Sequence, residues 1–162
     1  DRLPVVIVYQ DRLIEESLAG QALLQREEER TARMVEERKE IERAFEQEER
    51  ELAEKRESLS REEFARLAEE FDERVRAARK RQEEKAVAAQ RAIEAERKRF
   101  LDSLRPVLVE VMQRFGASIL MEGRAVLLAD PSLDVTGEVI ARMDEIYRQQ
   151  NPESEDPPAD DP

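Results

Sequence analysis

The sequence predicts an α+β protein that is mostly α: a long antiparallel coiled-coil hairpin arm on a small β-body that other copies of the chain complete. Three observations favour this fold. Charged residues of both signs make up 42% of the 162 residues and lie among strong helix formers, whereas aromatic residues make up only 4%, which is typical of long exposed helices. A helix-start signal interrupts this charged tract near its middle, and short β-branched runs lie near both of its ends.

Composition excludes most catalytic chemistry. The sequence contains no Cys and no His, which removes thiol chemistry, imidazole bases and the usual zinc ligands. Its four glycines lie far apart and form no phosphate-binding loop, and carboxylates on thin exposed helices lack the burial that general acid catalysis requires. We therefore expect no enzyme activity, no cofactor and no metal. A net charge of −12 also argues against nucleic-acid binding.

The first twenty residues predict a strand followed by a helix. Residues 4–9 are apolar and mostly β-branched on both faces, the pattern of a strand buried on both sides. Asp11 is expected to cap the helix that follows, with Leu13 and Leu18 on its apolar face. We expect residues 1–20 to form the β-containing body together with residues 101–150.

Residues 21–100 predict the hairpin arm. Between 26 and 57 the apolar residues thin to a narrow stripe with spacings of 4 and 7, the width of a coiled-coil seam. Ser60 and Glu63 have the spacing of a capping box, which places the tip near residues 58–61. A similar stripe follows the tip. In an antiparallel hairpin the residues that face each other have numbers with a constant sum, and Phe45 and Val75 give 120.

Beyond the arm the periodicity changes. Pro106 is expected to kink the second helix or to mark where arm becomes body. The segments on either side of Gly123 predict a β-hairpin. Asp134 or Thr136 is then expected to cap a last helix, which ends near Tyr147. The acidic, Pro-rich residues 151–162 predict a disordered tail.

Three short strands and one packing helix do not suffice to bury the apolar strand residues within one chain, so we expect an oligomer. The residues expected at the oligomer interface are Val5, Val6, Ile7, Val8, Ile119, Leu120, Val126, Leu127 and Leu128.

The order of these elements resembles the Skp/OmpH family of periplasmic chaperones. The resemblance is sharpest in VVIVYQDRLIEESLAG (5–20) and FGASILMEGRAVLLADPSLDVTGEVIARMDEIY (115–147). It implies a homotrimer with a shared β-body and three arms around a cavity, in which unfolded outer-membrane proteins are held without ATP in the periplasm. It also implies a secretory signal already removed. Familiar members are strongly basic whereas this chain is acidic, so any contact with a membrane surface or lipopolysaccharide is expected to be weak.

Two groups of arm residues are candidates for binding such clients, the unfolded polypeptides that a chaperone holds. The alternative for the apolar candidates is that they pack in the seam between the two helices of the hairpin. The basic candidates would instead form a solvated face whose charges pair with those of the facing helix, on Glu36, Glu37, Glu40 and Glu42. The candidates are Leu59, Phe64, Leu67, Phe71, Arg76, Arg79, Lys80 and Arg81.

Two functions remain open from the sequence. The first is an ATP-independent holdase, a chaperone that binds unfolded proteins and prevents their aggregation. The alternative is a structural coiled-coil spacer or adaptor that binds one defined partner helix through the seam. A spacer has no need for a shared β-body, so the strand-forming ends favour the holdase.

Overall fold

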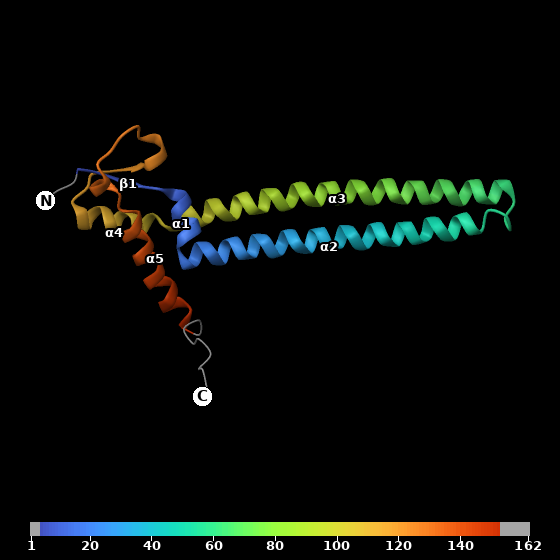
Figure 1. The fold of residues 1–162 in the computed structure, drawn as a ribbon, viewed down its shortest axis with the longest axis horizontal. Helices are drawn as coiled ribbons and strands as arrows, with labels where there is room; N and C mark the ends of the chain where they lie inside the picture. Colours follow the sequence, from blue (N-terminus) through green and yellow to red (C-terminus); the bar gives the residue numbers. More distant parts are fainter. Residues whose placement is uncertain (1–3, 153–162) are drawn as a thin grey trace, which may run out of the picture. The chain divides into compact units, whose positions relative to one another are not determined.

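The structure, a computed structural model, describes residues 4–152. It is mostly helical, with one two-stranded sheet among the described residues (Figure 1). The tail predicted over 151–162 lies outside the described residues from position 153 onward. In chain order the elements are β1 (Val5–Val8), α1 (Gln10–Glu16), α2 (Leu18–Glu54), α3 (Arg61–Ser103), α4 (Arg105–Phe115), β2 (Ile119–Glu122), the 3₁₀ turns Gly123–Ala125 and Pro131–Leu133, and α5 (Thr136–Gln150).

The chain divides into two compact units. Within the described range, the terminal unit consists of residues 4–26 and 96–152, and the hairpin unit consists of residues 27–95. Both α2 and α3 cross this division.

The core of the terminal unit covers β1 with helices of the same chain. Val6 and Val8 are 0% and 2% exposed, and they pack among buried side chains of α1, α4 and α5. The expectation that one chain lacks the helices to bury this strand is therefore wrong for β1, because α4 joins α5 in the core. The buried cluster is Val6, Val8, Leu13, Leu104, Val107, Val111, Val135, Val139 and Met143.

The sheet pairs the two strands in parallel, with Val5 opposite Ile119 and Val8 opposite Glu122. On the other edge of β1, the Val135 N–H donates to the Ile7 carbonyl oxygen at 2.9 Å. The sheet therefore joins the first residues of the described chain to its C-terminal third.

The predicted β-hairpin around Gly123 is wrong. The chain turns into a 3₁₀ turn after β2 and forms no returning strand. A Cβ on Gly123 would lie 2.5 Å from the Tyr9 ring, so this glycine allows a close approach between ring and backbone. The Glu122 carboxylate accepts hydrogen bonds from the N–H groups of Gln10, at 2.9 Å, and Arg124, at 2.5 Å. These contacts direct the chain away from an antiparallel return.

A helix break at Ser17 was not predicted. Ser17 has an extended backbone (φ −82°, ψ 152°) between α1 and α2. Its Oγ donates to the Leu13 carbonyl oxygen at 2.5 Å and accepts from the Gly20 N–H at 2.9 Å, so it caps the start of α2. A Cβ on Gly20 would lie 1.9 Å from the Ile14 carbonyl oxygen. The bend therefore requires glycine at position 20.

The predicted helix caps have mixed outcomes. Asp11 does not cap α1, because the helix already begins at Gln10, with Tyr9 at the N-cap position. Asp134 does serve the start of α5, where its Oδ1 accepts from the Thr136 N–H at 2.9 Å. Thr136 in turn accepts from the Tyr9 N–H through its Oγ1, at 3.1 Å.

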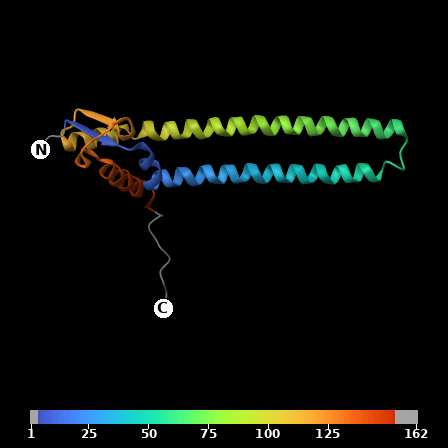
Figure 2. The same cartoon turned by 45° about the horizontal axis from the view of Figure 1, so that its top comes forward.

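Within the hairpin unit, α2 and α3 run side by side in opposite directions (Figures 1 and 2). Residues 55–60 connect them, and the Ser60 Oγ accepts from the Glu63 N–H at 3.2 Å, which confirms the predicted cap at the start of α3. Pro106 lies in the first turn of α4, just after α3 ends, and this confirms the predicted interruption of the second helix.

Candidate functional site

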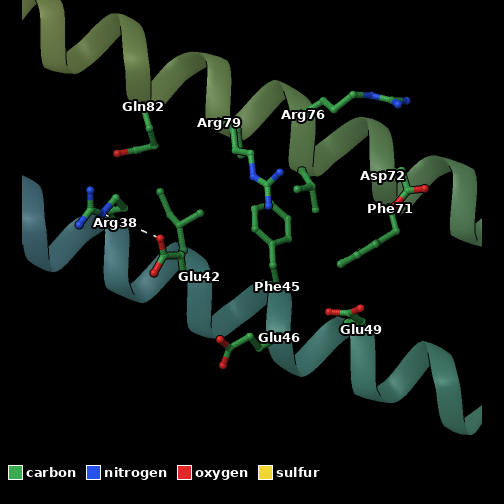
Figure 3. A pocket seen from close by; sticks show the side chains of 13 residues that line it. Arg38, Glu42, Phe45, Glu46, Glu49, Phe71, Asp72, Arg76, Arg79 and Gln82 are labelled. Carbon is green, nitrogen blue, oxygen red and sulfur yellow. Dashed lines mark ion pairs between the residues drawn. The ribbon is translucent and has the colours of Figure 1, made fainter.

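A groove of about 740 Å³ lies between α2 and α3 in the hairpin unit (Figure 3). Only one of its floor residues, Ala78, is buried, at 5% exposed, and the others are half-buried. The apolar floor consists of Ile41, Phe45, Phe71, Val75 and Ala78.

The aromatic part of the floor is an edge-to-face pair. The ring centroids of Phe45 and Phe71 lie 5.8 Å apart with an interplanar angle of 84°, the arrangement that aromatic quadrupoles favour. The Arg74 guanidinium lies over the Phe71 ring, 5.9 Å from its centroid. The pair thus joins the two helices in the hairpin unit.

Charged side chains surround this floor. On the α2 side Glu42 forms a loose ion pair with Arg38 at 3.9 Å. On the α3 side Arg79 extends toward the space between the helices, whereas the Arg76 guanidinium lies farther from α2 (Figure 3). Among residues 4–152, neither Arg76 nor Arg79 forms an ion pair. The groove therefore presents an apolar floor beside Arg79, a cation that forms no ion pair within the described residues.

The groove continues along the hairpin. A second cavity of about 370 Å³ shares Arg38 and Gln82 with the first. Its apolar lining residues are Met34, Val35, Ala86, Ala89 and Ile93. The two cavities therefore adjoin at Arg38 and Gln82, with apolar lining residues on either side.

Only three of the eight candidate client-binding residues lie at this groove: Phe71, Arg76 and Arg79. Three others, Leu59, Phe64 and Leu67, are half-buried nearer the turn between the helices. Lys80 and Arg81 are exposed and do not line the groove.

Of the floor residues, Phe71 was among the candidate client-binding residues, whereas Ile41, Val75 and Ala78 were assigned to the helix seam. Because these three share the spacing of the other seam residues, the sequence offers no separate signal for them.

Ion pairs across the hairpin involve both ends of the basic stretch 74–85. Arg74 bonds to Glu48 at 2.8 Å, and Lys85 bonds to Glu37. The hydrogen bond from Lys85, reinforced by its charge, holds the pKa of the Glu37 carboxyl below its usual value. In both pairs the residue numbers add to 122 (48 and 74, 37 and 85), close to the constant sum expected from the sequence.

A second exposed surface lies on the terminal unit. Leu127 and Leu128 are 103% and 91% exposed, and Ile119 of β2 is 52% exposed. Of the other predicted interface residues, Val6, Ile7 and Val8 are buried within the chain's own core, and Val5, Leu120 and Val126 are half-buried. Apolar side chains this exposed are typical of association surfaces.

Over the range 4–152 no group of three or more Asp or Glu residues is arranged to hold a metal ion. None of the helices in that range combines the length and apolarity that a membrane crossing requires.

Comparison with known proteins decides the family. The sequence profile described as outer membrane protein (OmpH-like) matches residues 4–143. The chain belongs to the OmpH-like family. A crystal structure of a candidate outer membrane chaperone (OmpH-like) from Caulobacter crescentus CB15 is similar, with a TM-score of 0.69 and 25% sequence identity over 90% of this chain and 87% of that chain. No curated protein sequence matches this chain.

The OmpH-like match confirms the resemblance found in the sequence. It extends from the residue before β1 into α5 and so covers both units. Charged helices alone would match many long helical proteins, whereas this match includes β1, β2 and the turns between β2 and α5.

Proposed function

We propose that this OmpH-like protein is an ATP-independent periplasmic holdase that binds unfolded outer-membrane proteins and prevents their aggregation. The family supports a chaperone that serves such clients. The observation that carries the proposal is the groove on the hairpin unit, whose apolar floor is open to solvent between strongly charged helices.

The groove suits a holdase because its contacts are weak and many. Each half-buried side chain offers a client only part of its apolar surface, at about 25 cal/mol per Å² buried. Clients of varied sequence are therefore held by several small contacts and released without an energy source. The surrounding charges keep the complex soluble.

We further propose that three copies assemble through their terminal units, with the hairpins as coiled-coil arms around a shared cavity. Exposed Leu127, Leu128 and Ile119 support this assembly. In addition, β2 pairs only with β1 among the described strands, so its outer edge is available to another chain.

The holdase proposal is tested by diluting a urea-unfolded outer-membrane β-barrel into buffer without nucleotide, with and without this protein in excess. We expect suppressed light scattering and a soluble complex on size-exclusion chromatography. Aggregation at an unchanged rate contradicts the proposal and favours a spacer with one defined partner.

The assembly proposal is tested by light scattering on the double variant Leu127→Ser/Leu128→Ser. Both side chains are exposed in the single chain, so we expect unchanged helicity by circular dichroism and a mass that falls from trimer toward monomer. Val87, 49% exposed on α3, provides the matched control, and Val87→Ser should leave the mass unchanged. A double variant that keeps the trimer mass contradicts this interface.

A further inference from the structure

We propose that the groove of the hairpin unit is a subsite for aromatic side chains of an unfolded polypeptide, with the ring held between the Phe45–Phe71 pair and the Arg79 guanidinium. This inference rests on the proposed holdase function and names the side chain that the groove selects.

The dimensions of the groove fit an inserted side chain better than a small molecule. Its volume of about 740 Å³ falls in the roughly 300–1,000 Å³ range of ligand sites, but it is open along the hairpin rather than enclosed. A polypeptide can therefore lie along the opening while one side chain enters. The edge-to-face phenylalanines at the floor are half-buried and leave apolar surface for a ring to cover.

Arg79 decides between an aromatic and an aliphatic occupant. Two other arginines of the hairpin already lie over phenylalanine rings: Arg74 over Phe71 at 5.9 Å and Arg56 over Phe64 at 5.5 Å. Arg79 lines the groove without such a ring of its own and forms no ion pair among residues 4–152. A guanidinium is attracted to the negative face of an aromatic ring, so a ring in the groove would supply the partner that Arg79 lacks.

The remaining charges argue against selection of an acidic segment. Three arginines and four carboxylates line the groove, for a net charge of −1. An acidic peptide would meet the carboxylates of the α2 side as well as Arg79. A neutral ring has no net charge to repel, and its quadrupole still favours the cation.

The absence of Trp from this protein allows a direct test on the full chain. A soluble, unstructured peptide with a single Trp would be titrated with the protein while the Trp fluorescence is recorded. The same peptide with cyclohexylalanine in place of Trp would compete for the site, because it keeps an apolar six-membered ring without a π face. We expect a blue shift for Trp and about three- to tenfold tighter binding of the Trp peptide.

Variants of Arg79 isolate the cation. Arg79→Met keeps an apolar stem and should reduce the ratio of the two affinities to near one. Arg79→Lys keeps the charge and should retain most of the preference. Arg91→Met is the matched control, because Arg91 changes the net charge equally on the same helix but lines neither cavity. It should leave the ratio unchanged.

A blocking variant tests the location independently of charge. Gln82 lines both cavities, and Gln82→Phe places a ring of the protein itself beside the floor. We expect it to weaken Trp-peptide binding several-fold while helicity by circular dichroism stays the same.

Two results overturn the inference: an unshifted Trp emission, or a Trp preference that persists in Arg79→Met. If wild-type protein nevertheless suppresses barrel aggregation, the holdase function stands and clients are held elsewhere. If aggregation is not suppressed, the proposed function fails, and the peptide ratio still decides whether the groove selects aromatic side chains.

Discussion

The terminal unit and the hairpin unit fold on different physical grounds. In the terminal unit Val6, Leu13 and Val139 are all 0% exposed. In the hairpin unit the buried residues are Ala78 and Glu27, at 5% and 8% exposed. The terminal unit therefore derives its stability from a packed core, whereas the hairpin relies on helix propensity, a narrow seam and surface ion pairs.

The two units also differ in how many positions require the backbone freedom of glycine. All four glycines, at positions 20, 116, 123 and 137, lie in the terminal unit. Gly116 ends α4 with a left-handed backbone (φ 63°), which favours glycine. The hairpin needs no such position, because it consists of two regular helices and one turn. Local opening should therefore cost less in the hairpin, which suits a surface that must adapt to varied clients.

The largest expected effect is the loss of a core leucine. Leu13→Ala should lower the free energy of unfolding by about 2–5 kcal/mol, since it removes a fully buried side chain and leaves a cavity. The same change in the hairpin, Leu67→Ala, should cost about 1 kcal/mol or less, because Leu67 is only half-buried. Urea unfolding followed by circular dichroism measures both values. Equal costs would contradict the division between a packed unit and a thinly packed one.

A smaller effect is expected from the backbone contact at the α1–α2 bend. Gly20→Ala should destabilise by about 1–3 kcal/mol, because its Cβ would lie 1.9 Å from the Ile14 carbonyl oxygen and the two helices must shift apart. Gly137→Ala is the matched control in the first turn of α5, where a Cβ meets nothing within 4 Å. That change should stabilise by about 0.4–1 kcal/mol. Thermal unfolding of the two variants gives the comparison, and shifts of the same sign would contradict it.

The sequence predicted regular elements better than the contacts between distant segments. The Ser60 cap, the helix boundary at Pro106 and the Asp134 turn each depend on residues within a few positions of one another. The local sequence is therefore sufficient to predict them. The bend at Ser17 was missed because Ser17 lies in an apolar helical pattern, and only the packing of Gly20 against Ile14 requires the break.

The β2 region shows the opposite limit of local prediction. The residues around Gly123 have the pattern of a β-hairpin, yet the Tyr9 ring and the Gln10 N–H group, more than 100 positions away, determine the turn. Most of the groove floor was likewise assigned to the seam, because spacing indicates which residues face the partner helix but not how closely the two helices pack there.

The smallest expected effect concerns the ion pair between Glu37 and Lys85 on the hairpin. Lys85→Gln removes the hydrogen bond and the charge that lower the pKa of the Glu37 carboxyl, so this pKa should rise toward its usual value in an NMR titration. Lys39→Gln, an equal loss of charge on α2, is the control and should leave the Glu37 pKa nearly unchanged.

The stabilising contribution of this pair is present above the unfolded-state pKa of Glu37 and is lost as the pH falls through the lower folded-state value. Because both side chains are about half exposed, water and salt screen the pair. Lys85→Gln should therefore change the urea midpoint far less than Leu13→Ala does at any pH. A midpoint shift as large as that of Leu13→Ala would mean that surface charge, rather than the terminal core, sets the stability of the chain.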